Sequence, residues 1–274
     1  MSTVLSVGMV DHLDGAGSGP TEAEIAFVKA YLAEGPMDPA LLAQAMSPER
    51  MAERAARTAE LRTRDWPNLG QYRDANAAVT KPVKAVFIGD SYTEFWQAAH
   101  PDFFSNGIIG RGISGQTSQQ MLLRFTPDVV ALKPSCVHIL AGANDVAGNT
   151  GPSTPQDYKN NMLAMITLAQ AHGIRIILGG LTLIEAFPWS PGVNPAAWLT
   201  ELNAWIRATA SEMGLIYADY PSVLANAGRP IRSDFSRDGV HPTAKGYAAM
   251  RPVAEAALAR VLGDGYPGRA EAPQ

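Results

Sequence analysis

The sequence predicts an α/β fold: a three-layer α/β/α sandwich on a five-stranded parallel sheet, with a helical N-terminal extension. From residue 84 onward, short apolar runs rich in Val and Ile alternate with stretches that leave room for crossover helices. Continuous apolar strands alternating with helices are typical of a parallel sheet covered on both faces. The 274 residues, 46% hydrophobic and 18% charged, also suit one large α/β domain with an appendage.

Residues 1–80 are predicted to form the helical extension. Three helix-start signals lie there, each a capping side chain with its partner: Thr21 with Glu24, Asp38 before Pro39, and Ser47 before Pro48. A Gly-Pro pair at residues 35–36 ends the first helical pattern, and residues 49–64 carry the longest one. These helices are a candidate interface for a homo-oligomer.

The main domain is predicted to span residues 81–262 as a doubly wound, flavodoxin-like sandwich. Its five strands are expected at residues 84–88, 107–109, 136–141, 174–178 and 215–218. Residues 263–274, rich in Gly, Pro and charge, are predicted to be a flexible tail. Open sheets of this kind bind ligands at the carboxyl ends of their strands, so the segments that follow the strands are the candidate site.

Composition argues against several classes of partner. The net charge of −4 gives no reason to expect nucleic acid, and no apolar stretch reaches the roughly 18 residues that a membrane span needs. The single cysteine, Cys136, lies in an apolar run and is expected to be a small core residue rather than a reactive thiol. Residues 1–5 lack the features of a secretory signal, which predicts a cytoplasmic protein; a secreted or periplasmic one is the alternative if a leader has been trimmed.

The first candidate segment is Gly89-Asp90-Ser91, directly after the strand that ends at Ile88. A serine at a strand-to-helix turn exposes its hydroxyl at the edge of the sheet. Its own N–H points into the site from the helix N-terminus, where developing negative charge is favoured. The alternative is ordinary turn and capping chemistry, which uses the same residue types.

The second segment, residues 110–118, follows the second strand. Glycine lets the backbone approach a ligand closely, so a main-chain N–H in this segment could donate to an oxyanion. Gly110, Gly112 and Gly115 also spell the dinucleotide-binding pattern G-x-G-x-x-G. That pattern requires an acidic residue about 20 positions further on, and the nearest candidate, Asp145, lies well beyond that distance. Dinucleotide binding is therefore disfavoured.

Two further segments complete the set. Asn144 follows the third strand, where its side-chain NH2 could be an oxyanion donor and Asp145 could fix the loop; the alternative is a simple Asn-Asp turn. Asp238 and His241 lie close enough on one loop for the carboxylate to hold Nδ1 and turn Nε2 toward the serine. The alternative is a helix-capping loop with an exposed histidine. Together the four segments supply each part of an acyl-transfer site.

These segments resemble the four motif blocks of the SGNH (GDSL) hydrolases, over roughly residues 84–262. The resemblance implies that Ser91 is the nucleophile, that His241 is the general base and that Asp238 orients it. It also implies that the N–H of Gly115 and the side chain of Asn144 join the N–H of Ser91 as the oxyanion hole. A flavodoxin-like sandwich, and no metal or organic cofactor, are implied as well. The extension of about 80 residues is not part of the minimal fold.

The expected function is a serine esterase acting on a small-molecule substrate, with short acyl (acetyl-type) esters of aryl or carbohydrate alcohols as the predicted class. An acyltransferase with the same triad and a non-catalytic carbohydrate- or nucleotide-binding module are the alternatives. In residues 185–192, Phe187 and Trp189 suit an acyl or sugar-ring contact, unless this is a plain core-capping loop. Arg111 could bind a polar or anionic substrate group, a structural ion pair being the alternative.

The remaining histidines fit structural roles. His138 lies within a predicted strand, and His172 precedes a glycine at a helix C-terminus. His12 and His100 have no set of metal-ligating residues near them in the sequence. The sequence therefore predicts no metal site.

Overall fold

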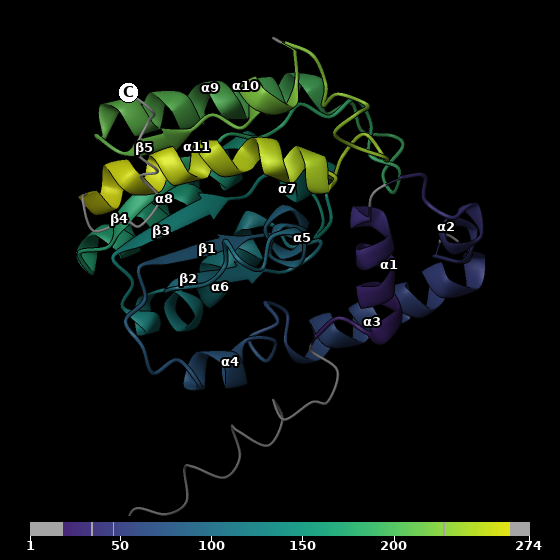
Figure 1. Cartoon of the computed structure of the whole chain (residues 1–274), viewed down its shortest axis with the longest axis horizontal. Coiled ribbons are helices and arrows are strands. Elements are labelled where there is room, and N and C mark those ends of the chain that lie inside the picture. The colour runs from purple at the N-terminus through teal and green to yellow at the C-terminus, as the bar shows by residue number, and fades with distance from the viewer. Residues whose placement is uncertain (1–18, 34, 46, 227, 264–274) are drawn as a thin grey trace, which may run out of the picture. The chain divides into compact units, whose positions relative to one another are not determined.

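The computed structural model describes residues 19–33, 35–45, 47–226 and 228–263 (Figure 1). The predictions for residues 1–5, for His12 and for residues 264–274 of the tail lie outside this range. The chain divides into two compact units, residues 1–80 and 81–274. No helix within the described ranges combines the length and the apolar character needed to cross a membrane.

The described part of the first unit contains four helices: α1 (Glu22–Leu32), α2 (Pro39–Ala45), α3 (Pro48–Arg64) and α4 (Arg73–Ala77). The three predicted helix starts are confirmed. At the first of them, Thr21 Oγ1 accepts the N–H of Glu24 at 3.2 Å while Glu24 Oε2 accepts the N–H of Thr21 at 2.7 Å. At the other two, Asp38 Oδ1 accepts the N–H of Ala40 at 2.8 Å, and Ser47 caps α3. A role of these helices in self-association stays a prediction.

The second unit is built on a five-stranded parallel sheet with the order β2-β1-β3-β4-β5. The strands are β1 (Ala85–Gly89), β2 (Ile108–Gly112), β3 (Cys136–Leu140), β4 (Arg175–Gly179) and β5 (Ile216–Ala218). This is the flavodoxin-like order, so the predicted fold class is confirmed. Every residue of β1 and β3 is buried, as their continuous apolar sequences require in a sheet covered on both faces.

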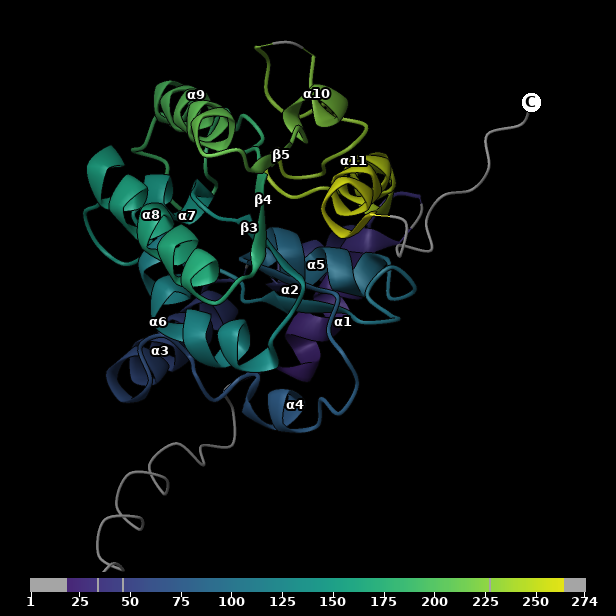
Figure 2. The same ribbon diagram turned by 90° about the vertical axis from the view of Figure 1, so that its left-hand side faces the viewer.

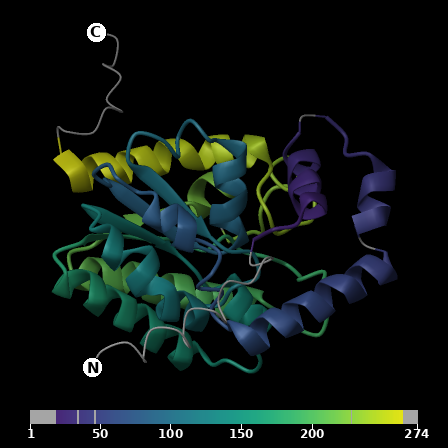
Figure 3. The same ribbon diagram turned by 90° about the horizontal axis from the view of Figure 1, so that it is seen from below.

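Helices cover both faces of the sheet (Figures 2 and 3). On one face lie α5 (Ser91–Ala99) and α11 (Ala244–Leu262); on the other lie α6 (Ser118–Asp128), α8 (Pro155–Ala171) and α9 (Ala196–Glu212). Shorter helices in the connections are η1 (Val130–Leu132), α7 (Ala143–Ala147) and α10 (Pro221–Leu224). The predicted three-layer sandwich is therefore observed.

The strand β2 extends to Gly112, so the prediction that it ends near residue 109 is wrong. Gly110 and Gly112 are strand residues, and only Gly115 lies in the loop that follows. Glycine is needed in this part of the strand because β2 packs closely on α5. A Cβ on Gly112 would lie 2.3 Å from the main-chain nitrogen of Glu94 and 2.7 Å from the carbonyl oxygen of Asp90. The missing side chains of Gly110 and Gly112 make room for α5 rather than for a pyrophosphate.

The strand register places the candidate segments side by side at one edge of the sheet. Gly89, the last residue of the central strand β1, pairs with Gly112 on one side and Leu140 on the other. The residues that follow these three positions therefore leave the same edge of the sheet side by side. They include Ser91, the Gly115 turn and Asn144.

The predicted structural roles of His138, His172 and Cys136 are confirmed. His138 is buried in β3, stacks on the ring of Phe87 at 4.3 Å between centroids, and has Nε2 2.8 Å from the Tyr220 hydroxyl. Burial lowers the pKa of His138 to about 3, so its ring is neutral. His172 is the C-cap of α8. Cys136 is buried, and burial raises the pKa of its thiol to about 12.

Candidate active site

Ser91 lies at the turn from β1 to α5, at the carboxyl edge of the sheet. Asp90 is the N-cap of α5, and its Oδ1 accepts the N–H of Tyr92 at 2.9 Å. Because Ser91 is the first helical residue, its N–H has no acceptor within the helix and lies at the positive end of the helix dipole. The turn requires glycine at position 89, where a Cβ would lie 2.9 Å from the carbonyl oxygen of Leu140.

His241 reaches the serine from the loop that precedes α11. Its Nε2 lies 2.9 Å from Ser91 Oγ, and its Nδ1 lies 2.7 Å from Asp238 Oδ2. The other carboxylate oxygen, Asp238 Oδ1, accepts the N–H groups of Val240 at 2.9 Å and of His241 at 2.8 Å. From α5, the Tyr92 hydroxyl donates to the carbonyl of Val240. The structure thus brings the predicted nucleophile, base and orienting carboxylate together in the geometry of a serine-hydrolase triad.

Asp238 is ionised in this arrangement. Burial by itself raises the pKa of its carboxyl. The hydrogen bond and charge of His241, with the two main-chain N–H groups, hold that pKa well below its usual range. A carboxylate here keeps the Nδ1 hydrogen on the ring and leaves Nε2 able to accept the Ser91 proton.

Aromatic rings surround His241. The ring centroids of Phe95 and Tyr92 lie 5.0 and 6.2 Å from that of His241, and Trp189 lies 6.1 Å away. Trp189 is 40% exposed and comes from the loop after β4, so part of this ring is accessible to a ligand. Phe187, on the same loop, is buried and packs on Trp189 at 5.2 Å. The expectation that both loop aromatics offer a substrate contact is therefore wrong for Phe187, because its ring belongs to the core.

The turn at Gly115 offers a main-chain donor. Gly115 has a φ of +79°, a left-handed conformation that favours glycine. Within the described part of the chain no group accepts its N–H, which is therefore free to bind an oxyanion. Glu94 of α5 holds the turn, because its Oε2 accepts the N–H of Ser114 at 2.7 Å as well as the Ser114 hydroxyl.

Asn144 is buried at the start of α7. Its Nδ2 donates to the carbonyl of Gln116 at 3.0 Å and to Asp90 Oδ2 at 3.2 Å. Both hydrogens are therefore engaged, so Asn144 Nδ2 can donate to a further acceptor only in place of one of these two bonds. The adjacent Asp145 accepts the N–H of Ser118 at 3.0 Å and its hydroxyl, which fixes the loop as predicted.

Asp90 and Asp145 form a pair of buried carboxyls beside these donors. Burial raises the pKa of each to about 6. For Asp90, the N–H of Tyr92 and the charge of His241 act in the opposite direction, whereas the charge of Asp145 adds to the increase. Each carboxyl is therefore partly protonated near pH 6.

Arg124 is a supporting residue that the sequence analysis missed. It is fully buried on α6, where its guanidinium donates to Asp128 Oδ2 at 2.9 Å and to Gln116 Oε1 at 2.5 Å. It also donates to the carbonyls of Gly89 and Arg111 at 2.9 Å each. One side chain thus ties β1 and β2 to the loop that contains Gln116. An arginine four residues before an aspartate in the same helix was the available signal.

Arg111 does not face a substrate. Its side chain is buried and donates to the carbonyl of Gly110 at 2.8 Å. The expectation that it could bind an anionic substrate group is wrong, because the guanidinium is covered by protein.

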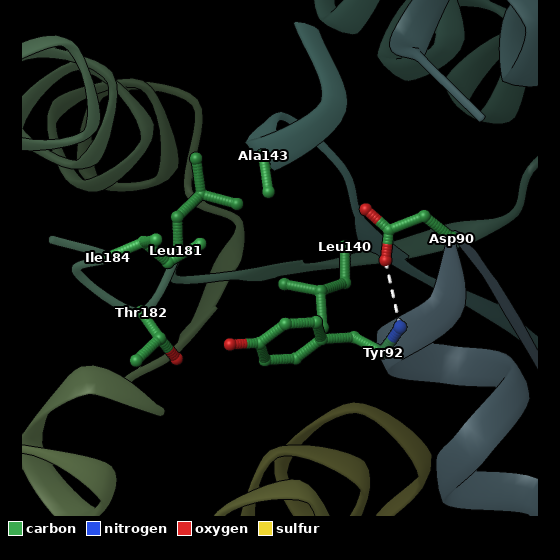
Figure 4. A pocket seen from close by; sticks show the side chains of 7 residues that line it. All are labelled: Asp90, Tyr92, Leu140, Ala143, Leu181, Thr182 and Ile184. Carbon is green, nitrogen blue, oxygen red and sulfur yellow. Dashed lines mark hydrogen bonds between the residues drawn. The ribbon is translucent and has the colours of Figure 1, made fainter. Parts of the chain in front are cut away.

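A small pocket lies next to Asp90 and Tyr92, the residues that flank the nucleophile in sequence (Figure 4). Its volume is about 250 Å³, including the space at its open mouth. In Figure 4, Asp90 lies on one side and the residues after β4 on the other, and the Tyr92 ring extends from the Asp90 side toward Thr182. The lining is mainly apolar and consists of Asp90, Tyr92, Leu140, Ala143, Leu181, Thr182 and Ile184.

Metal-ligating side chains do not cluster in the described ranges, where no group of three or more His, Cys, Asp or Glu could hold an ion.

Comparison with known proteins agrees with this geometry. A model of the GDSL-like lipase/acylhydrolase family matches residues 87–249. A Bacteroides fragilis protein named as an acylhydrolase has a solved structure that superposes with a TM-score of 0.70 at 40% identity, covering 72% of this chain and 99% of that one. A GDSL-like lipase from Bacteroides thetaiotaomicron superposes with a TM-score of 0.69 at 39% identity, with the same coverage.

Two other proteins are less similar, one because it matches only a short part of the chain and the other because its sequence identity is low. The uncharacterized lipoprotein YqeF of Bacillus subtilis is 36% identical over 74 residues, which span 26% of this chain and 30% of that protein. The acetylxylan esterase Axe2 of Geobacillus stearothermophilus shares the fold, with a TM-score of 0.52 at 19% identity over 67% of this chain and 95% of its own.

Proposed function

The chain belongs to the GDSL-like lipase/acylhydrolase family, and from that membership we propose that it is a serine esterase that forms an acyl-enzyme on Ser91. The observation that carries the proposal is the relay of short contacts, 2.7 Å from Asp238 to His241 and 2.9 Å from His241 to Ser91 Oγ. A serine hydroxyl is a weak nucleophile until an oriented base accepts its proton. This relay supplies such a base.

In the proposed reaction, His241 Nε2 takes the Ser91 proton as Oγ attacks the ester carbonyl. The tetrahedral oxyanion is stabilised by the N–H groups of Ser91 and Gly115 and by the Asn144 amide. Protonated His241 then gives its proton to the leaving alcohol, and the acyl group stays on Oγ. Water, activated by the same histidine, attacks the acyl-enzyme and releases the acid.

We propose acetyl-type esters of aryl or carbohydrate alcohols as the substrate class. The pocket beside Asp90 and Tyr92 is small and mainly apolar, which suits a short acyl group. The half-exposed ring of Trp189 beside His241 suits a flat aryl group or a sugar ring on the alcohol side. Axe2, which has this fold, is an acetylxylan esterase, so the fold can accommodate acetyl esters of a carbohydrate.

A series of p-nitrophenyl esters from acetyl to decanoyl tests the acyl preference. We expect kcat/KM to be highest for the acetyl or propionyl ester and to fall as the chain outgrows the pocket. A maximum at octanoyl or decanoyl would contradict the short-acyl assignment while leaving the esterase intact. Repeating the acetyl reaction with a sugar or alcohol acceptor, and analysing the products, distinguishes hydrolysis from acyl transfer.

A further inference from the structure

Asn149 joins the two segments that carry the proposed oxyanion donors. It follows Gly148, the C-cap of α7, and its Nδ2 donates to Asn144 Oδ1 at 2.7 Å and to the carbonyl of Gly115 at 3.2 Å. Its main-chain N–H also bonds to the carbonyl of Asn144 at 3.1 Å. A single amide group therefore holds the Gly115 turn and the Asn144 side chain together.

The hydrogen bond from Asn149 to Asn144 Oδ1 fixes the orientation of the Asn144 side-chain amide. Asn144 Oδ1 must point toward a donor, and Asn149 supplies it. Asn144 Nδ2 is then directed to the opposite side, where it meets Asp90 Oδ2, next to the nucleophile in the chain. Without this donor, the Asn144 amide could rotate and present an oxygen where a hydrogen-bond donor is needed.

The contact with Gly115 acts on the second donor. Gly115 has a left-handed backbone, and a hydrogen bond to its carbonyl fixes the direction of the turn that carries its N–H. An oxyanion hole stabilises charge only while its donors keep the right separation. Asn149 fixes that separation.

The other end of the Asn149 side chain reaches the substrate side. Its Oδ1 accepts Nε1–H of Trp189 at 3.0 Å, the ring that lies 6.1 Å from His241. Both hydrogens of the amide and its oxygen are thus used. Asn149 therefore contacts both the proposed oxyanion donors and Trp189, the ring proposed to contact the alcohol part of the substrate.

We propose that Asn149 is a positioning residue that holds the Gly115 and Asn144 donors in place and links them to Trp189. This inference rests on the proposed serine-esterase function and assigns a role to a residue outside the triad and the oxyanion hole. Asn149 does not touch the substrate in this role. It acts through Asn144 and Gly115.

Two substitutions test the donor role on p-nitrophenyl acetate, with kcat expressed per active site titrated by a fluorophosphonate, so that unfolded protein is not counted. Asn149→Ala removes the two hydrogen bonds that the side chain donates to Asn144 and Gly115, and is expected to lower kcat by ~10- to 100-fold with little change in KM. Asn149→Asp keeps the shape but replaces the donor by an acceptor, which favours rotation of the Asn144 amide, so a larger loss is expected. Asn160→Asp, at an exposed position of α8, controls for the added charge and should keep the wild-type kcat.

The link to Trp189 has its own test. Trp189→Phe removes the indole N–H and keeps an aromatic ring, so a smaller loss of kcat is expected than for Asn149→Ala. The double variant should be no slower than Asn149→Ala alone, because the Trp189 bond acts through Asn149. Additive losses would overturn the link.

The outcomes separate this inference from the proposed function. If wild-type protein hydrolyses the ester and both Asn149 variants retain kcat within twofold, the positioning role is wrong and the esterase stands. An equal loss of kcat for Asn149→Asp and Asn160→Asp would also overturn it. If wild-type protein neither hydrolyses the ester nor reacts with the fluorophosphonate, the proposed function itself fails.

Discussion

The carboxylate of Asp238 holds the main chain and the ring of His241 at the same time. Oδ1 accepts the His241 N–H at 2.8 Å, and Oδ2 lies 2.7 Å from Nδ1. The ring can therefore neither turn away nor change tautomer without breaking a bond to a partly buried charge. This fixes Nε2 toward Ser91 Oγ, which belongs to a segment 150 residues earlier in the chain.

Asp238→Asn is expected to lower kcat for p-nitrophenyl acetate by about 10³- to 10⁴-fold, while near-UV circular dichroism stays native. An amide at this position can donate to Nδ1, which places the ring hydrogen on Nε2 and removes its ability to accept the Ser91 proton. A loss of less than tenfold would show that the carboxylate does not set the tautomer.

Asn144→Ala is expected to lower kcat by about 100- to 1000-fold, the usual cost of one oxyanion donor. The side chain also satisfies the Gln116 carbonyl, so the variant should be less stable by about 1–3 kcal/mol yet remain folded at 25 °C. Initial rates and urea unfolding measure the two effects separately. Full activity in the folded variant would exclude Asn144 from the oxyanion hole.

Arg124→Met is expected to lower the free energy of unfolding by about 3–5 kcal/mol, because it removes the ion-pair partner of Asp128 within the core. The double variant Arg124→Met/Asp128→Leu should recover part of that loss, since a buried ion pair can be replaced by apolar side chains of similar volume. Urea denaturation of the three proteins provides the comparison. A single-variant loss under about 1 kcal/mol would contradict a structural role for this arginine.

Asp90 makes the stability of the fold depend on pH. Burial raises its pKa from 3.8 to about 6. Between these two pH values, the folded protein keeps a proton on Asp90 that the unfolded chain has released. The stability gained from this proton is complete below the unfolded pKa and is lost as the pH rises through about 6. Asp90→Asn retains a capping side chain and removes the titration.

Between about pH 4 and pH 7, the free energy of unfolding of Asp90→Asn should therefore fall less than that of the wild type, by on the order of 1–3 kcal/mol. Asp145 titrates in the same direction in both proteins, so the difference between the two profiles reports the titration of Asp90 together with its coupling to Asp145. Parallel pH profiles from urea denaturation would mean that the Asp90 carboxyl is not protonated in the folded state near pH 5.

The sequence was sufficient to predict the sheet and the residues that meet at its edge, because each of Ser91, Gly115 and Asn144 lies a few residues after a strand. Strand register then brings these segments together. Asp238 and His241 were predictable because they share one short loop. In all of these cases local sequence determines the position.

Arg124 and Asn149 could not be predicted in this way. Each has a main-chain partner far away in the chain: the Gly89 carbonyl is 35 residues from Arg124, and the Gly115 carbonyl is 34 residues from Asn149. Main-chain carbonyls carry no sequence signal. For the same reason, the roles of Gly110 and Gly112 became clear only once α5 was seen to pack on β2.

Labelling with a fluorophosphonate probe tests the central claim most directly. We expect wild-type protein to be labelled on the peptide that contains Ser91, identified by mass spectrometry, because the probe requires a serine activated by a neighbouring base. Ser91→Ala, which keeps the fold, should not be labelled. No labelling of the folded wild-type protein, or equal labelling of the two proteins, would contradict the assignment of Ser91 as the nucleophile.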